Sequence, residues 1–446
     1  MIQELHYYKF KKQYLSIMQY YSLNNKEHFV SFQEAVTNGL APDKGLYFPN
    51  EIPKLENSFF NSIESLSHEE IAFKTIQPYI GNEIPEKELK KIISETLSFE
   101  FPLVQLENNV FSLELFHGPT MAFKDVGARF MSRCLGYFNK DKDTNNTVLV
   151  ATSGDTGGAV ASGFLGVKGV EVVILYPSKK VSDIQERQLT TLGQNITALE
   201  VDGVFDDCQD MVKRAFLDQD LKHKKLTSAN SINIARWLPQ MFYFFFAYKE
   251  LKKYNKPIIT SCPSGNFGNI CAGILAKKMG LPIHHFVATT NANDTVPRFL
   301  RDGVYQPKPS IATISNAMDV GNPSNFVRIQ EMYANDLKAF EKDFSSYSYS
   351  DKETKEIMQS IYSDSNYIAE PHGAVGYLGL QRALALQPES IGFFLETAHP
   401  IKFLDIVEPT LSITLEIPKQ IQTVLNKNKK SIPIKKYDEL KEFLLK

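Results

Sequence analysis

Residues 147–166 read TVLVATSGDTGGAVASGFLG, and our interpretation of the fold starts from this stretch. Residues 147–152 are apolar or β-branched and predict a buried strand. The glycine turn at 153–157 leads into small residues that predict a helix. Two further strands follow: VEVVILYP precedes a predicted helix from Ser182 to Leu192, and ITALEV precedes the helix DDCQDMVKRAF. This βαβαβ order predicts a parallel sheet covered by helices.

The same order returns later in the chain, after a long helix around IARWLPQMFYFFFAYKEL. PIITSCP predicts a strand, SGNFGN a turn, ICAGILAKKMG a helix, HHFVATT a strand, and IGFFLET at 391–397 a last strand. We therefore predict an α/β protein with parallel open sheets in two domains, at 101–222 and 223–446. Residues 1–100 are more polar and punctuated by prolines, and they predict a separate, mostly helical N-terminal domain.

The composition excludes several classes of protein. Lys and Arg number 49 against 51 Asp and Glu, so the net charge is −2 and argues against a nucleic-acid or membrane-surface protein. None of the four cysteines forms a C-x-x-C pair, so neither a zinc site nor a disulfide framework is indicated. The apolar cluster at 241–248 is too short to span a bilayer, and the N-terminus lacks a signal-peptide pattern. A cytoplasmic protein without a metal fits best.

Two similar turns, SGDTG at 153–157 and SGNFG at 264–268, each follow a predicted strand and precede a predicted helix. Such a junction directs backbone N–H groups and the positive end of the helix at one point, where an anion can bind. Neither turn matches G-x-G-x-x-G or the P-loop spacing. Most glycine-rich corners only turn the chain, but two similar ones favour a protein that binds two anionic groups.

Lys124 lies in ELFHGPTMAFKD at 114–125, just after a Gly-Pro-Thr corner and beside apolar residues. A helix N-terminus and apolar neighbours both disfavour an ammonium group, and the neutral amine is the form that makes a Schiff base. The local sequence alone favours an ordinary lysine that extends its charge to solvent. With two anion sites, however, Lys124 fits pyridoxal phosphate, and Thr397 either faces the pyridine nitrogen or simply ends a strand.

Five motifs occur together and in order: ELFHGPTMAFKD, TSGDTGGAVA, SGNFGN, SNAMDVGNPSNF and ETAHPIKF. Together they resemble the threonine synthase family of fold type II pyridoxal-phosphate enzymes, and the segment MQYYSLNN…VSFQEAVTNGLAPDKGLYFP is similar to the start of that family. The resemblance runs from about Met18 nearly to the C-terminus. Residues 1–17 fall outside it, so we expect a natural start at Met18, with residues 1–17 either an extension or a misassigned upstream reading.

The resemblance implies roles for particular residues. Lys124 would be the Schiff-base lysine and Thr397 the partner of the pyridine nitrogen. The cofactor phosphate would lie at Gly265, Asn266, Phe267, Gly268 and Asn269. The substrate carboxylate and the 3′-oxygen of the cofactor would lie at Ser153, Gly154, Asp155, Thr156 and Gly157. Many fold type II relatives have Asn where this chain has Asp155, and an acid beside the 3′-oxygen would change the protonation of the ring.

The segment NSINIAR at 230–236 has two equal interpretations. Asn230, Ser231, Asn233 and Arg236 can bind the substrate phosphate, or Asn230 and Ser231 can cap the following helix. His117, His372 and His399 are candidates to lie near the site, but a single histidine is more often structural.

The activity implied by the resemblance is the conversion of O-phospho-L-homoserine and water to L-threonine and phosphate. Three alternatives remain open from the residues. The first is a phospho-lyase that gives 2-oxobutyrate from the same substrate, and the second is a threonine or serine dehydratase. The third is a non-catalytic anion-binding protein. We expect a small-molecule substrate, no nucleic-acid or membrane partner, and a monomer or homodimer.

Overall fold

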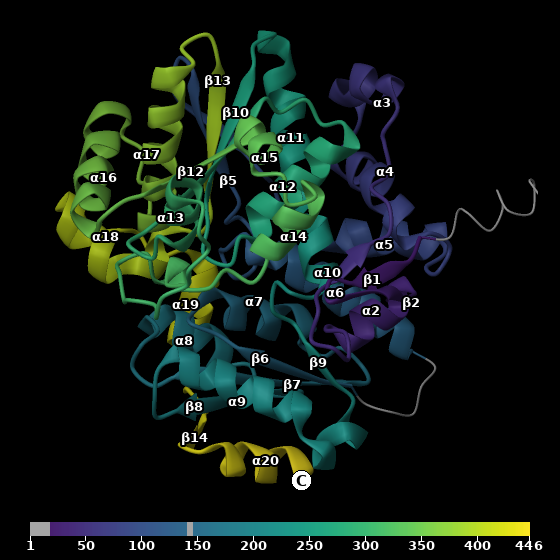
Figure 1. Cartoon of the computed structure of the whole chain (residues 1–446). Helices are drawn as coiled ribbons and strands as arrows, with labels where there is room; N and C mark the ends of the chain where they lie inside the picture. Colours follow the sequence, from purple (N-terminus) through teal and green to yellow (C-terminus); the bar gives the residue numbers. More distant parts are fainter. Residues whose placement is uncertain (1–17, 141–145) are drawn as a thin grey trace, which may run out of the picture.

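The computed structural model describes residues 18–140 and 146–446, and Figure 1 shows two sheet-containing halves with the N-terminal segment beside them. The predicted extension at residues 1–17 lies outside the described residues. The lower half in Figure 1 contains a five-stranded parallel sheet in the order β14-β8-β7-β6-β9. Its strands are β6 (Asn146–Ala151), β7 (Val170–Pro177), β8 (Ile196–Val201), β9 (Leu226–Ser228) and β14 (Ile432–Ile434).

The βαβαβ prediction from residues 147 to 216 is confirmed. The intervening helices are α7 (Asp155–Phe164), α8 (Asp183–Thr190) and α9 (Phe205–Leu217). β6 is buried along its whole length because helices cover both faces of a parallel sheet, which explains its continuous apolar sequence. The C-terminal α20 (Tyr437–Leu445) packs against α9 on this sheet.

The upper half in Figure 1 contains a six-stranded sheet in the order β12-β11-β10-β13-β5-β4. Its strands are β4 (Leu103–Glu107), β5 (Val110–Glu114), β10 (Ile258–Pro263), β11 (His285–Thr290), β12 (Phe344–Ser348) and β13 (Ile391–Glu396). The predicted strands at 257–263, 284–290 and 391–397 are therefore confirmed. All neighbours in this sheet are parallel except β4 and β5, which form an antiparallel edge.

The sheets are not consecutive in the chain. β4 and β5 precede the five-stranded sheet in sequence but join the six-stranded one, and β14 returns from the C-terminus to the five-stranded one. The domain boundaries at residues 100 and 222 stay a prediction.

The helices between and after these strands pack on the six-stranded sheet, on one another or against helices of the other half. They are α6 (Lys124–Asn139), α10 (Ile234–Trp237), α11 (Phe242–Leu251), α12 (Gly268–Met279), α13 (Thr295–Asp302), α14 (Phe326–Met332), α15 (Leu337–Asp343), α16 (Asp351–Ser365), α17 (Pro371–Leu386), α18 (Leu404–Leu411) and α19 (Lys419–Leu425). α11 is apolar on all sides because it is buried on nearly all sides. Among the described residues, no helix is both long enough and apolar enough to cross a membrane.

The N-terminal segment combines helices with a small sheet that the sequence did not predict. The helices are α2 (Phe32–Asn38), α3 (Asn57–Ser62), α4 (His68–Ile80) and α5 (Glu86–Thr96), and the antiparallel strands are β1 (Tyr20–Ser22), β2 (Asn25–Val30) and β3 (Tyr47–Pro49). This segment packs on the rest of the protein through Phe48, whose ring lies 5.8 Å from that of Trp237. Arg328 fixes the contact by donating a 2.9 Å hydrogen bond to the Tyr47 carbonyl.

Candidate active site

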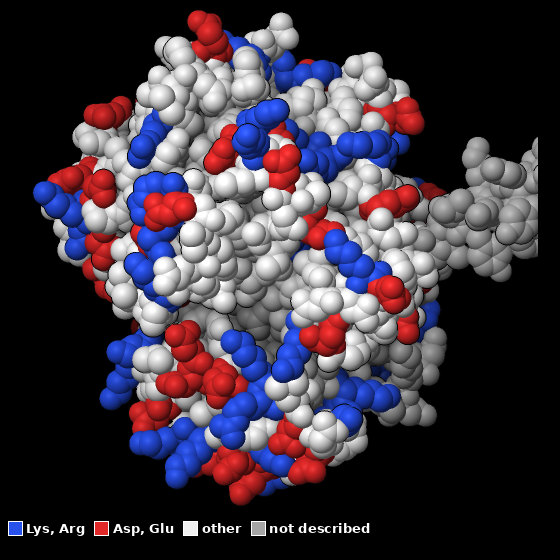
Figure 2. Space-filling view, in the orientation of Figure 1, with Lys and Arg blue, Asp and Glu red and all other residues white. Residues whose placement is uncertain are grey.

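A cavity lies between the two halves, where β6, β10 and β13 end. Its lining includes residues that follow these three strands: Thr152 and Ser153 after β6, Gly265 after β10, and Thr397 after β13. Ligands of open α/β sheets bind at such carboxyl ends. A wider cleft shares Phe205 and Val320 with the cavity, and Figure 2 shows a hollow at this level of the surface.

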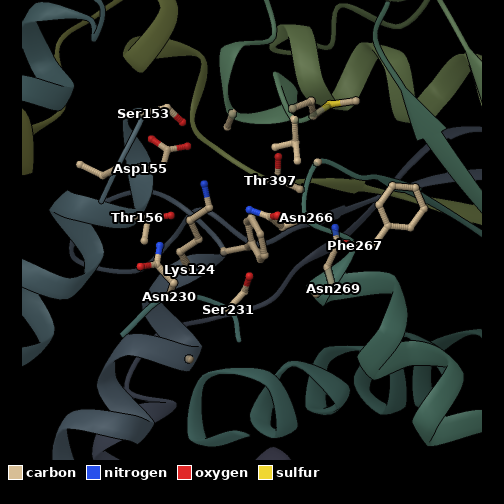
Figure 3. A pocket seen from close by; sticks show the side chains of 18 of the residues that line it. Lys124, Ser153, Asp155, Thr156, Asn230, Ser231, Asn266, Phe267, Asn269 and Thr397 are labelled. Carbon is tan, nitrogen blue, oxygen red and sulfur yellow. The ribbon is translucent and has the colours of Figure 1, made fainter. Parts of the chain in front are cut away.

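Lys124 is the first residue of α6 and extends its amine into the cavity (Figure 3). The corner before it is rigid. Buried Asp125 accepts hydrogen bonds from the Thr120 amide at 2.9 Å and the Thr120 hydroxyl at 2.7 Å, and the Phe123 amide donates to the Thr397 carbonyl at 2.8 Å. Met121 adopts a φ of 57°, in the left-handed region that non-glycine residues rarely occupy.

The surroundings of Lys124 make its amine easier to deprotonate than an ordinary lysine amine. Burial lowers its pKa to about 8, with Lys402 and Arg236 acting in the same direction and Asp155 opposing them. Within the part of the chain that the structure describes, the amine has no hydrogen bond and no ion pair, and it lies 5.6 Å from the centre of the Phe123 ring. A lowered pKa supports the Schiff-base interpretation of Lys124, which stays a prediction.

The turn at 264–269 forms a cradle of backbone donors, and all five predicted residues from Gly265 to Asn269 line the cavity. Their amide N–H groups donate no hydrogen bond to any other described residue. Phe267 has a φ of 59°, and its side chain points away from the cavity to pack on Phe326 (Figure 3). The strained turn thus leaves a set of free donors at the N-terminus of α12, which suits a phosphate group.

The turn at 153–157 forms a second set of donors on the opposite side of Lys124. The Thr152 hydroxyl fixes it by accepting from the Gly154 and Gly157 amides at 3.0 and 2.9 Å. Gly154 needs its glycine because its φ is 151°. The amides of Ser153, Asp155 and Thr156 make no hydrogen bond within the described residues, and these three residues line the cavity. Gly154 and Gly157 support the turn and do not line the cavity.

Thr397 also lines the cavity, and its hydroxyl is oriented by Glu370 at 3.3 Å. The same buried carboxylate accepts from Nδ1 of His372 at 2.5 Å. Nε2 of His372 in turn accepts from the Ala317 amide at 3.1 Å, so both ring nitrogens of His372 have partners. Sequence reasoning missed Glu370, because a glutamate before a proline carries no signal of burial.

The comparisons with known proteins agree with this geometry. Residues 19–97 match the family model described as threonine synthase N terminus, and residues 98–396 match that of pyridoxal-phosphate dependent enzymes. The threonine synthase of Escherichia coli K12 is 44% identical over 406 residues, which cover 91% of this chain and 94% of that protein. The chain belongs to the threonine synthase family. It is therefore a pyridoxal-phosphate-dependent lyase of fold type II.

Solved structures of threonine synthases support the family at the level of the fold. The crystal structure of the Escherichia coli enzyme matches with a TM-score of 0.90 at 42% identity and covers 96% of this chain and 99% of that one. The pyridoxal-phosphate-bound threonine synthase of Brucella melitensis also matches with a TM-score of 0.90, at 33% identity, covering 96% of this chain and 98% of that one.

The residues of this threonine synthase family member fit its cofactor. The 265–269 cradle offers free donors for a phosphate, and the Lys124 amine faces the same cavity. A Cβ atom on Gly265 would come within 2.7 Å of the Ala317 carbonyl oxygen, so the cradle is closely packed from behind.

The segment 230–236, for which the sequence left two interpretations, divides in the structure. Asn230, Ser231 and Arg236 line the cavity. Asn233 does not, because it caps α10 by accepting from the Ala235 amide at 3.0 Å and donates to the Val36 carbonyl at 2.9 Å. Thus the helix-capping role belongs to Asn233 and not to Asn230 or Ser231.

Arg236 contributes positive charge that is only partly neutralised. Its Nη1 donates to the Ala229 carbonyl, while its buried Nε has no hydrogen-bond partner within the described residues. Burial lowers its pKa to about 10, so the guanidinium remains charged at neutral pH.

Two of the predicted histidines lie outside the cavity lining. His117 pairs with Glu114 at 2.7 Å. His399 caps the turn after β13 by accepting from the Ile401 amide at 3.1 Å, and burial lowers its pKa to about 4. Their structural interpretation agrees with these contacts, whereas His372 lines the cavity.

Proposed function

We propose that this protein converts O-phospho-L-homoserine and water to L-threonine and inorganic phosphate, the last step of threonine biosynthesis. Membership of the threonine synthase family supports the activity. The observation that carries the proposal is the position of the Lys124 amine between two sets of free backbone donors, one for each of two anionic ligand groups.

One set of donors is assigned to the cofactor. The amides of residues 265–269 bind the phosphate of pyridoxal phosphate, Lys124 holds the cofactor covalently, and Thr397 faces the pyridine nitrogen. The cofactor, when bound, supplies a ring that withdraws electrons from the carbon next to the substrate amine. Thr397 would offer the ring nitrogen a hydroxyl rather than a carboxylate, and a neutral partner of this kind would not favour a protonated nitrogen.

The other set of donors is assigned to the substrate. The amides of Ser153 and Thr156 bind its carboxylate, with Gly154 and Gly157 shaping the turn, and Asp155 faces the cofactor's 3′-oxygen. Asn230, Ser231 and Arg236 bind its phosphate. Once the substrate amine has displaced it, the neutral Lys124 amine removes the proton from the α-carbon.

Three further properties belong to this proposal. The protein works in the cytoplasm, as a monomer or a homodimer, and needs no nucleic-acid or membrane partner. Its near-neutral charge of −2 is compatible with all three.

The products formed from O-phospho-L-homoserine test the activity. The cofactor-loaded protein is incubated with this substrate and the products are followed by NMR, with L-threonine as a parallel substrate and Lys124→Ala as the matched control. Threonine with equimolar phosphate, absent from the control, is the expected result. Phosphate with 2-oxobutyrate would make the protein a phospho-lyase, and 2-oxobutyrate from L-threonine without phosphate would make it a dehydratase.

A further inference from the structure

A buried ion pair lies directly behind the cavity wall. Lys402 follows β13 in the segment HPIKF and is completely buried, and its Nζ lies 2.6 Å from Oδ1 of Asp155. The same Nζ donates a 2.9 Å hydrogen bond to the Thr120 carbonyl, at the corner that leads into Lys124. Lys402 therefore joins three loops of the site, yet it does not line the cavity itself.

Only one of the two carboxylate oxygens of Asp155 has partners among the described residues. Its Oδ1 receives Lys402 and, at 3.1 Å, Nε2 of Gln185. Its Oδ2 accepts no hydrogen bond from any described residue, while the side chain lines the cavity. Although burial raises the pKa of Asp155, the positive charges of Lys402 and Lys124 outweigh this effect and hold the pKa well below its usual range. An ionised carboxylate with one free oxygen thus faces the cavity.

The balance of charge around Lys124 depends on this pair. Among the described residues, the other charged or titratable groups that interact with the pair or with Lys124 are Arg236, Glu370, His372, Asp125 and His399. Asp155 raises the pKa of Lys124 and Lys402 lowers it, so the two members of the pair oppose each other. Removing either member leaves the charge of the other uncompensated beside the amine.

We propose that Lys402 is a positioning residue, whose charge neutralises Asp155 so that Asp155 presents an ionised acceptor to the cavity without holding Lys124 as an ammonium ion. This inference rests on the proposed role of Lys124. Together, Asp155 and Lys402 carry no net charge.

The pH dependence of cofactor attachment tests the proposal. In this step the Lys124 amine attacks the aldehyde carbon of pyridoxal phosphate, a carbon–nitrogen double bond forms, and the aldehyde oxygen leaves as water. Only the neutral amine reacts. The attachment rate of full-length protein stripped of cofactor is therefore measured by absorbance between about pH 6 and pH 10.

The two single variants have opposite expected effects. Lys402→Met leaves Asp155 to pair with Lys124, so the midpoint of the pH profile rises by about one unit or more. Asp155→Asn leaves the Lys402 charge beside Lys124, so the midpoint falls by a similar amount. The double variant Lys402→Met/Asp155→Asn removes both charges, and its midpoint returns to within about half a unit of the unaltered protein.

These outcomes separate the inference from its alternatives. A purely structural Lys402 would reduce stability in each variant without opposite shifts, and that result would overturn the proposal. If Lys402→Met does not fold, Asp155→Asn should still lower the midpoint and the double variant should still restore it; a double variant whose midpoint stays as low as that of Asp155→Asn would overturn the proposal. Reduction with borohydride and peptide mapping of the unaltered protein would place the cofactor elsewhere than Lys124 if the proposed function is the part that fails.

Discussion

Substituting Gly265 by alanine is expected to weaken binding of the cofactor phosphate without unfolding the protein. The added Cβ would lie 2.7 Å from the Ala317 carbonyl oxygen and 3.0 Å from Cα of Met318, both of which belong to the backbone. Neither atom can move as a flexible side chain would, so the 265–269 cradle must shift. A charge-assisted hydrogen bond contributes about 1.5–3 kcal/mol. Losing one such bond to the phosphate weakens affinity about tenfold to 100-fold.

Gly268 provides the matched control within the same turn. A Cβ there would lie 3.2 Å from Cβ of Ser231 and 3.4 Å from Nδ2 of Asn325, which are longer contacts than those at Gly265 and need only a small shift of the neighbours. We expect Gly268→Ala to retain most of its affinity for the cofactor.

The assay compares pyridoxal phosphate with pyridoxal, which lacks the phosphate. The affinity ratio between the two compounds should fall in Gly265→Ala and change little in Gly268→Ala, while circular dichroism and thermal unfolding report on the fold. If Gly265→Ala weakens both compounds equally, or neither, the phosphate does not bind at this cradle.

Three shorter predictions concern the amine and its support. Lys124→Ala should keep its far-ultraviolet circular dichroism but no longer hold the cofactor covalently. Its turnover should fall at least about 100-fold, since general acid–base catalysis alone supplies that much. Normal turnover would contradict the role assigned to Lys124. Cofactor attachment by the unaltered protein should accelerate as pH rises through about 8, because the lowered pKa frees the amine there, and a rate independent of pH would contradict this. Glu370→Gln should lower the free energy of unfolding by about 1–3 kcal/mol, because buried Glu370 accepts hydrogen bonds from Thr397, His372 and Gly373. Denaturant titration measures this loss. An unchanged free energy of unfolding would mean that these hydrogen bonds do not stabilise the fold.

The sequence predicted the parts of the fold that depend on local pattern. The runs at 147–152 and 391–397 are continuous and apolar because both faces of a parallel strand are buried, and each leads into a loop of the cavity. The positions of the two glycine turns followed from this rule, since strand ends in a parallel sheet face the same edge.

The pairings between distant segments could not be read from the sequence. β1 and β3 have only three residues each, and β2 reads NKEHFV with five exposed positions, so no apolar alternation marks this small sheet. β5 and β4 likewise join the six-stranded sheet because β5 pairs with β13, which follows almost 280 residues later in the chain. In both cases the information lies in partners, not in the strands.

Within the site, the sequence also could not show which charged residues are buried. Lys402 sits in HPIKF and Asp155 in SGDTG, and neither stretch alone separates a solvated charge from a buried one. A buried charge is stable only when a partner of opposite sign is brought to it, and that partner is set by the tertiary fold. Asp155 therefore looked like a departure from the usual asparagine until the structure placed Lys402 at 2.6 Å. Asp155 and Lys402 therefore act as one unit. Exchanging Asp155 for Asn without also changing Lys402 should destabilise the protein more than exchanging both residues.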